Sequence, residues 1–460
     1  MREKTKRTTE LAVLFASFMF LQLTVLWMGN HAGEGYLPVD QREMVYYILQ
    51  VFAILGFLAY AAARGLLRGA SAGRGVTAGL LAVFFAGAAA LLLTEGSRLH
   101  LAVTYATVLC LGCLGGMVYE RMSGAAARGE GAAWSMGVGC ATAYALQYFL
   151  QLRRSILPLL AAVMLAAFVL LARALLRETP PAAPASEGKG LRRLLIPCLI
   201  AATLLLFTSF YNGYIHHLQV VSGYGAYNVY SWPRLMLVPC FLFFGLIGDR
   251  RQGRLVPIAA LCIALAALLN SALVGNTGAY WLNMCLFYCA LAGVVAYYDL
   301  TFWWLAPGTK HPALWASMGR ILDSAVVLFT GLLRISALPA AAILSVDVAG
   351  LAVILVLMAV NGDFIFAASA PEPAPPGPPD REDRLAAIAA RCGLSPAEAR
   401  VLRELVLTED KQAAIAERLS IRVSTVQHHT TAIYRKTGAS TRAGLSRLYH
   451  DGAPEEPPPR

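Results

Sequence analysis

A predicted helix near the C-terminus carries hydrogen-bonding side chains on one face. These residues repeat at spacings of four, three and four: Ser424, His428, Thr431 and Arg435. A second set repeats in the same way on the opposite side, which we expect to face a core: Val426, Thr430, Ile433 and Thr437. The polar face suits a DNA major groove, where base edges offer hydrogen bonds and phosphates flank them. The pattern fits the solvated face of a small helical bundle equally well.

Two apolar segments further upstream contain ionisable residues. Arg320 and Asp323 are three residues apart, so they can pair on one face of a helix, and Asp347 lies in the following apolar segment. Charges inside a membrane are costly and often mark a ligand or proton site. We therefore predict a membrane ligand site or switch at these three residues. The alternative is a structural ion pair together with an acid shielded by neighbouring helices.

Other chemistry finds little support in the sequence. The nine cysteines lie almost entirely in apolar segments, where cysteine packs as a small apolar residue, so we expect no metal site and no disulfide framework. We find no nucleophile elbow, phosphate loop, HExxH motif or paired catalytic carboxylates. The chain is therefore predicted to be no enzyme and to need no cofactor.

The composition is that of an all-α, polytopic membrane protein. Of 460 residues, 58% are hydrophobic and 14% are charged, and mean hydropathy is +0.58. Twelve segments are apolar over a length that approaches the ~20 residues of a spanning helix. They cover residues 11–29, 44–63, 76–94, 99–119, 132–151, 155–176, 194–214, 233–248, 255–275, 278–298, 313–333 and 340–360. Eleven or thirteen spans are the alternatives, because the eighth segment is short and the break around Arg153 and Arg154 is weak.

The basic residues between these segments predict the orientation. If the N-terminus is cytoplasmic, eighteen Lys and Arg residues lie on the inside and six on the outside. This positive-inside bias predicts that both termini lie in the cytoplasm and that the chain is embedded in the cytoplasmic (inner) membrane.

The arrangement of the segments resembles the major facilitator superfamily of transporters. A longer inside loop at residues 177–193 divides the spans six and six. The stretch GLIGDRRQGR, residues 245–254, is similar to that family's loop signature, with matches at Gly245, Asp249, Arg250, Gly253 and Arg254. The resemblance implies a bundle of two six-helix halves over residues 1–366.

The C-terminal part of the chain has a different composition. Residues 367–382 are rich in proline, which favours an extended linker. Residues 383–452 have the pattern of a soluble four-helix domain, and residues 453–460 that of a disordered tail. Ser395 with Glu398 predicts a capping box, Asp410 a cap for the second helix, and Ser440 or Thr441 a cap for the fourth.

The stretches LSPAEARVL and AIAERLSIRVSTVQHHTTAIYRKTGASTRAGL resemble the LuxR-type helix-turn-helix, a winged-less DNA-binding domain of bacterial regulators. The resemblance implies that the third helix reads DNA and that the fourth makes a dimer contact. Carried over by position, the resemblance implies that DNA is contacted by Thr425, Gln427, His428, Thr431 and Lys436. The polar face and its margin add Arg422, Ser424 and Arg435 to the predicted DNA-binding residues. The implied dimer-contact residues are Arg442, Leu445 and Leu448.

Together these features predict a membrane-integrated transcriptional regulator, a one-component sensor. Its twelve-span domain would sense a small-molecule ligand or a membrane cue, and its C-terminal domain would bind double-stranded promoter DNA as a homodimer. The expected partners are therefore DNA, a second copy of the chain, a ligand of unknown identity and membrane lipid. The alternative is a major-facilitator-like transporter with a regulatory tail.

Overall fold

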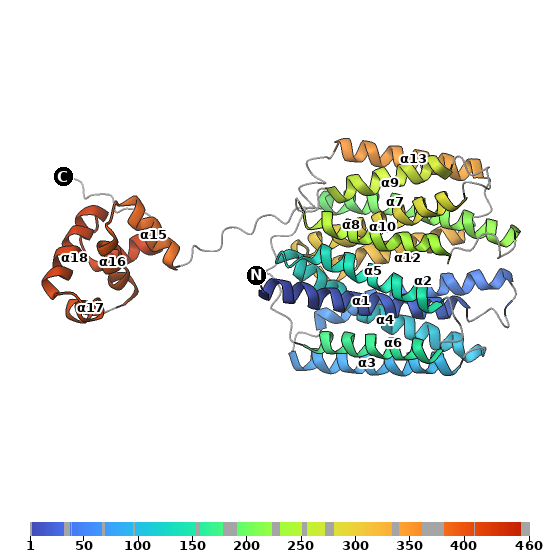
Figure 1. Cartoon of the computed structure of the whole chain (residues 1–460), viewed down its shortest axis with the longest axis horizontal. Helices are drawn as coiled ribbons and strands as arrows, with labels where there is room; N and C mark the ends of the chain where they lie inside the picture. Colours follow the sequence, from blue (N-terminus) through green and yellow to red (C-terminus); the bar gives the residue numbers. More distant parts are fainter. Residues whose placement is uncertain are drawn as a thin grey trace. The chain divides into compact units, whose positions relative to one another are not determined.

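The computed structural model separates the chain into two compact units, Met1–Pro371 and Glu372–Arg460. It describes residues 2–31, 37, 39–66, 70–94, 97–151, 157–177, 191–222, 231–250, 255–271, 280–333, 340–360, 381–408 and 410–451. Every regular element in these ranges is a helix (Figure 1). The all-α class predicted from the sequence is therefore confirmed.

The first unit, here called the membrane unit, has a helix that overlaps each of the twelve predicted segments. Its first six helices are α1 (Arg2–His31), α2 (Val39–Leu66), α3 (Ala70–Leu93), α4 (Arg98–Ala127), α5 (Ala132–Gln151) and α6 (Leu157–Leu176). The remaining elements are α7 (Leu191–Ser222), η2 (Trp232–Met236), α8 (Leu237–Gly248), α9 (Leu255–Ser271), α10 (Tyr280–Leu305), η5 (Ala306–Gly308), α11 (Pro312–Ala316), α12 (Met318–Leu332) and α13 (Ala340–Val360).

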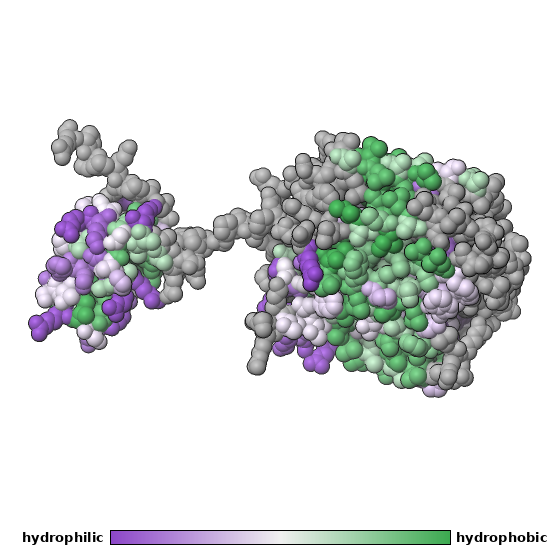
Figure 2. Space-filling view, turned by 45° about the horizontal axis from the view of Figure 1, so that its top comes forward, coloured by the Kyte–Doolittle hydropathy of each residue, from purple (hydrophilic) through white to green (hydrophobic). Residues whose placement is uncertain are grey.

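Six helical stretches among the described residues are long and apolar enough to cross a membrane. They are Thr5–Gly29, Met44–Arg64, Gly73–Leu93, Leu99–Ala127, Leu157–Leu176 and Trp281–Gly308, and shorter apolar helices accompany them. On the face shown in Figure 2, hydrophobic side chains form a broad band across this unit, and hydrophilic ones gather at one end. The unit is thus a membrane domain, while the count of twelve spans stays a prediction.

The two halves of the membrane unit, α1–α6 and α7–α13, join along the helix pairs α5–α8 and α2–α12. The α5–α8 pair comes very close because glycines face each other there. A Cβ atom built on Gly137 would lie 2.8 Å from the Cα atom of Gly245 and 2.5 Å from the carbonyl oxygen of Phe241. Such an approach of two backbones has no room for a side chain, so both glycines are required by packing.

The second unit, here called the tail unit, has its own hydrophobic core. Its helices are α15 (Arg381–Arg391), α16 (Pro396–Leu407), α17 (Gln412–Arg418), α18 (Val423–Thr437) and α19 (Arg442–Asp451). The prediction of four helices was wrong, because α15 is a fifth helix that places Leu385 and Ile388 in the core. Its first turn also takes residues 381–382 from the predicted linker, whereas residues 367–380 and 453–460 lie outside the described residues.

The predicted helix caps of the tail unit are partly confirmed. Ser395 and Glu398 form the capping box, and the Thr441 hydroxyl accepts a hydrogen bond from the Gly444 amide at 3.1 Å. Asp410 does not cap α17, which follows Lys411 without a side-chain cap. The Asp410 carboxylate instead pairs with Arg418 in the last turn of that helix.

Candidate functional site

A helix, a turn and a second helix organise the exposed surface of the tail unit. α17 ends at Arg418, and Ser420 turns the chain with a φ of 54° before α18 begins. Arg422 precedes α18 and makes no side-chain cap. α18 packs against both α16 and α17, so one long side of it is fixed in the core and the other side remains at the surface.

The two predicted faces of α18 occur in the structure. Its inner residues are all buried: Val426, Thr430, Ile433 and Thr437. Its outer residues are all exposed: Ser424, His428, Thr431 and Arg435. Arg422 and Gln427 are exposed at the margin, and Thr425 is half-buried. The division into faces is therefore confirmed, and contact with DNA stays a prediction.

Lys436 differs from the other predicted DNA-binding residues because its ammonium group forms an ion pair within the tail unit. Its Nζ atom donates to Oε2 of Glu398 at 2.7 Å and to the carbonyl oxygen of Gly393 at 3.1 Å. The same Oε2 atom accepts from the Ser395 amide at 2.6 Å. The capping box of α16 is thus tied to the last turn of α18, which fixes the angle at which the outer face is presented.

The Glu398–Lys436 pair predicts an acid-sensitive tail unit. The hydrogen bond from Lys436, followed by that from the Ser395 amide, lowers the pKa of Glu398 to about 2. The pKa of a glutamate in an unfolded chain is ~4.3. The ion pair therefore stabilises the unit fully above that pH, and its contribution is lost as the pH falls toward the folded pKa.

We expect the thermal unfolding temperature of residues 372–460 to fall over this acidic range, and Glu398→Gln to remove part of that dependence. Circular dichroism melting curves at a series of pH values measure both effects. An unchanged pH profile in the Gln variant would show that other carboxylates control acid unfolding.

The predicted dimer-contact residues lie inside one copy of the tail unit. Leu445 and Leu448 belong to its core, with 1% and 5% of their surface exposed. The Arg442 guanidinium donates to the carbonyl oxygens of Leu405 at 2.8 Å and Asp410 at 2.6 Å, and also to that of Thr408. These side chains hold α19 to the end of α16, so they do not form a free dimer surface.

In the membrane unit, the predicted pair is present on α12. Nη1 of Arg320 donates to Oδ2 of Asp323 at 3.2 Å and to the Tyr298 hydroxyl of α10 at 2.7 Å. Asp347 is placed elsewhere, on α13, which packs against α7 and α9. Its Oδ1 atom is buried without a hydrogen-bond partner among the described residues. The structure thus shows a pair and a separate acid.

The sequence analysis missed Asp299, which lies beside this pair on α10. The residue is 1% exposed, and the Tyr119 hydroxyl of α4 donates to its Oδ2 atom at 3.4 Å. A signal was present, because Asp299 is an acid within the apolar stretch that forms α10. Its proximity to Arg320 depends on the packing of α10 against α12 and was not visible in the sequence.

Asp249 of the loop signature also acts between the halves. Its carboxylate accepts hydrogen bonds from the amides of Trp134 at 2.9 Å and Ala133 at 3.3 Å, at the start of α5. A carboxylate at a helix N-terminus satisfies free amides and interacts favourably with the helix dipole. The signature therefore has a structural role here, locking the end of α8 to α5. Gly253 and Arg254 lie outside the described residues.

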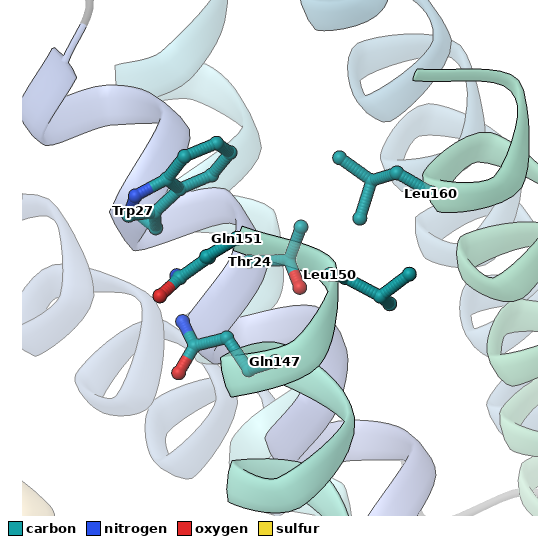
Figure 3. A pocket seen from close by; sticks show the side chains of 6 residues that line it. All are labelled: Thr24, Trp27, Gln147, Leu150, Gln151 and Leu160. Carbon is teal, nitrogen blue, oxygen red and sulfur yellow. The ribbon is translucent and has the colours of Figure 1, made fainter. Parts of the chain in front are cut away.

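A small pocket opens between α1, α5 and α6 (Figure 3). Its lining residues are Thr24, Trp27, Gln147, Leu150, Gln151 and Leu160. Arg234 of η2 approaches it, donating to Oε1 of Gln147 at 2.9 Å and lying over the Tyr144 ring at 5.6 Å from its centroid. Amide, hydroxyl, indole and apolar groups line the pocket, and the Arg234 cation is hydrogen-bonded to one of its amides.

Comparison with known proteins concerns the fold. No family model matches the chain, and no curated protein matches it. Among solved structures, the crystal structure of the human organic anion transporter MFSD10 (TETRAN) is similar, with a TM-score of 0.50. The match covers 79% of this chain and 99% of that chain.

The membrane unit has a major-facilitator-like fold. The predicted resemblance to that superfamily is confirmed at this level. The sequence identity to MFSD10 is 15%, and a shared fold at such identity does not establish a shared activity. The comparisons lend no support to a LuxR-type domain, which stays a prediction.

Proposed function

We propose that the chain is a membrane-integrated regulator that binds double-stranded DNA through α18 of the tail unit. The observation that carries the proposal is the exposed polar face of α18, which follows α17 through a tight turn. Side chains of this kind on a supported helix match the hydrogen-bonding edges and phosphates of a major groove. The buried residues on the opposite side of α18 keep the helix rigid, so little conformational entropy is lost on binding.

In this proposal, the membrane unit senses a ligand or a membrane cue. A cue can act only if it interacts differently with two states of the unit. Both termini lie in the cytoplasm and the chain resides in the inner membrane, so the tail unit reaches promoter DNA. A second copy pairs with the first on DNA through α19. Since Leu445 and Leu448 are buried, this contact uses the outer side of that helix, where Ala443 and Arg447 are exposed.

The experiment uses residues 372–460, which have their own core, and short DNA duplexes in a fluorescence anisotropy titration. We expect weak binding that falls steeply with salt. Arg435→Ala removes a cation from the outer face and lowers affinity for all sequences, with a salt slope smaller by about one. His428→Ala and Thr431→Ala lie mid-face and change sequence preference instead.

The control is Arg400→Ala, which removes an exposed cation from α16. If Arg435→Ala and Arg400→Ala lower the affinity for DNA equally, general charge attraction explains the binding and α18 does not read the DNA sequence. If none of these substitutions changes DNA affinity or sequence preference, the proposal is rejected. Genome-wide mapping of DNA bound by the intact protein then identifies the operator.

Transport is the second candidate function, and the structural comparison supports it better than regulation. The membrane unit is similar in fold to MFSD10, which is an organic anion transporter. Arg234 beside Gln147 offers a cationic, amide-lined environment for an anion. Uptake of labelled organic anions by vesicles containing the protein tests this candidate. Uptake that matches protein-free vesicles contradicts it.

A further inference from the structure

The two halves of the membrane unit meet around Asp299 on the side where α1 begins. The Tyr119 hydroxyl of α4 donates to Oδ2 of Asp299 on α10 at 3.4 Å. One turn further along both helices, the Ser123 hydroxyl donates to the carbonyl oxygen of Trp303 at 2.9 Å. Asp299 therefore belongs to the contact that closes this side.

The surroundings of Asp299 exclude water. The Tyr119 ring contacts the rings of Phe15, Phe18, Phe57 and Trp303 at centroid distances of 5.9, 6.1, 6.0 and 5.5 Å. Oδ1 of Asp299 is buried and has no hydrogen-bond partner within the described part of the chain. An ionised carboxylate with such limited hydrogen bonding is costly in an apolar interior.

The charges that face Asp299 do not neutralise it. Tyr119 from α4, Cys140 from α5 and Arg320 with Asp323 from α12 interact electrostatically with it. Arg320 is already committed, at 3.2 Å, to Asp323 and, at 2.7 Å, to the Tyr298 hydroxyl. With Asp299 ionised, the group of two carboxylates and one guanidinium has a charge of −1. With a proton on Asp299, the group is neutral.

We propose that Asp299 is a proton-binding site and that its bound proton holds α4 and α10 together. The carboxylate takes the proton from water when this side is open, and the neutral acid is then buried as the halves close. Release returns the proton to water and favours separation, since the ionised carboxylate is better solvated. A metal cation is a poorer occupant, because the Arg320 guanidinium repels it. No cluster of three metal-binding side chains occurs among the described residues.

This proton site goes beyond either proposed function. It supplies a chemical cue for a regulator or a coupling ion for a transporter, and it depends on neither DNA binding nor solute uptake. Its test therefore uses conformation and protonation of the intact protein.

The first experiment is infrared difference spectroscopy of the full chain in lipid nanodiscs between acidic and alkaline buffer. We expect a carbonyl band of a protonated carboxyl group that disappears at alkaline pH. Asp347 is another buried acid with an unpartnered oxygen, and its protonated form would give a band in the same region. The measurement therefore uses the Asp347→Asn background, in which the band remains while Asp299 is present and Asp299→Asn removes it. A band retained in the double variant overturns the proposal.

The second experiment measures hydrogen–deuterium exchange at the C-terminal turns of α4 and α10 across the same pH range, corrected for intrinsic exchange. We expect protection to fall as Asp299 ionises and to stay high in Asp299→Asn. Should that variant fail to fold, Tyr119→Phe removes the hydrogen bond to the carboxyl group and shifts the carbonyl band. Either an unshifted band in Tyr119→Phe or a normal pH response in Asp299→Asn excludes Asp299 as the proton site.

Discussion

The substitution Gly137→Val is expected to prevent correct packing of α5 against α8. A Cβ atom at this position would lie 2.5 Å from the carbonyl oxygen of Phe241, and these neighbours are backbone atoms that cannot rotate away. Overpacking a well-filled core commonly costs ~1–3 kcal/mol, and a clash with the backbone of α8 belongs at the upper end of this range or above it. Thermal unfolding of the detergent-solubilised full chain measures the loss.

Gly79→Val provides the matched control. Gly79 lies in α3 of the same unit, and a Cβ atom there would meet nothing within 4 Å. The same change of residue should therefore leave the unfolding temperature nearly unaltered. If both variants lose equal stability, the effect arises from valine in a helix and not from the crossing of α5 and α8. If neither does, the halves do not approach as closely as described.

The substitution Arg442→Ala is expected to destabilise the tail unit strongly. The guanidinium donates hydrogen bonds to the carbonyl oxygen of Leu405, in the last turn of α16, and to those of Thr408 and Asp410, which follow that helix. Each hydrogen bond to a charged group contributes ~1.5–3 kcal/mol, although the losses are not additive. A total loss of ~3 kcal/mol in the free energy of unfolding is a large part of the stability of a domain of this size. Urea unfolding of residues 372–460 measures it.

Arg400→Ala is the comparison for this measurement, since it removes an exposed arginine of α16 and should change stability by less than ~0.5 kcal/mol. Arg442→Lys tests the geometry of the contact. A single ammonium group cannot reach three carbonyl oxygens as a planar guanidinium does, so we expect only partial recovery. Full recovery by lysine would show that the charge matters and the fork of hydrogen bonds does not.

Local patterns in the sequence determined the features that depend on neighbours along the chain. Apolar length identified the helices of the membrane unit, because backbone groups in lipid must be satisfied within each helix. Spacing of four, three and four separated the buried and exposed faces of α18, because helix geometry is fixed at 3.6 residues per turn. The capping box at Ser395 was also predictable, since its partners are three residues apart.

Tertiary structure decided which polar groups meet across helices. Lys436 was predicted to contact DNA from its place on α18, but it forms an ion pair with Glu398, which is distant in the sequence. Asp347 was grouped with Arg320 by order along the chain, whereas packing brings Asp299 to that pair and leaves Asp347 on another helix. Burial of Leu445 and Leu448 likewise depends on α15 and α16. Such choices follow from long-range packing, in which the free energy of a buried charge depends on neighbours that sequence spacing does not specify.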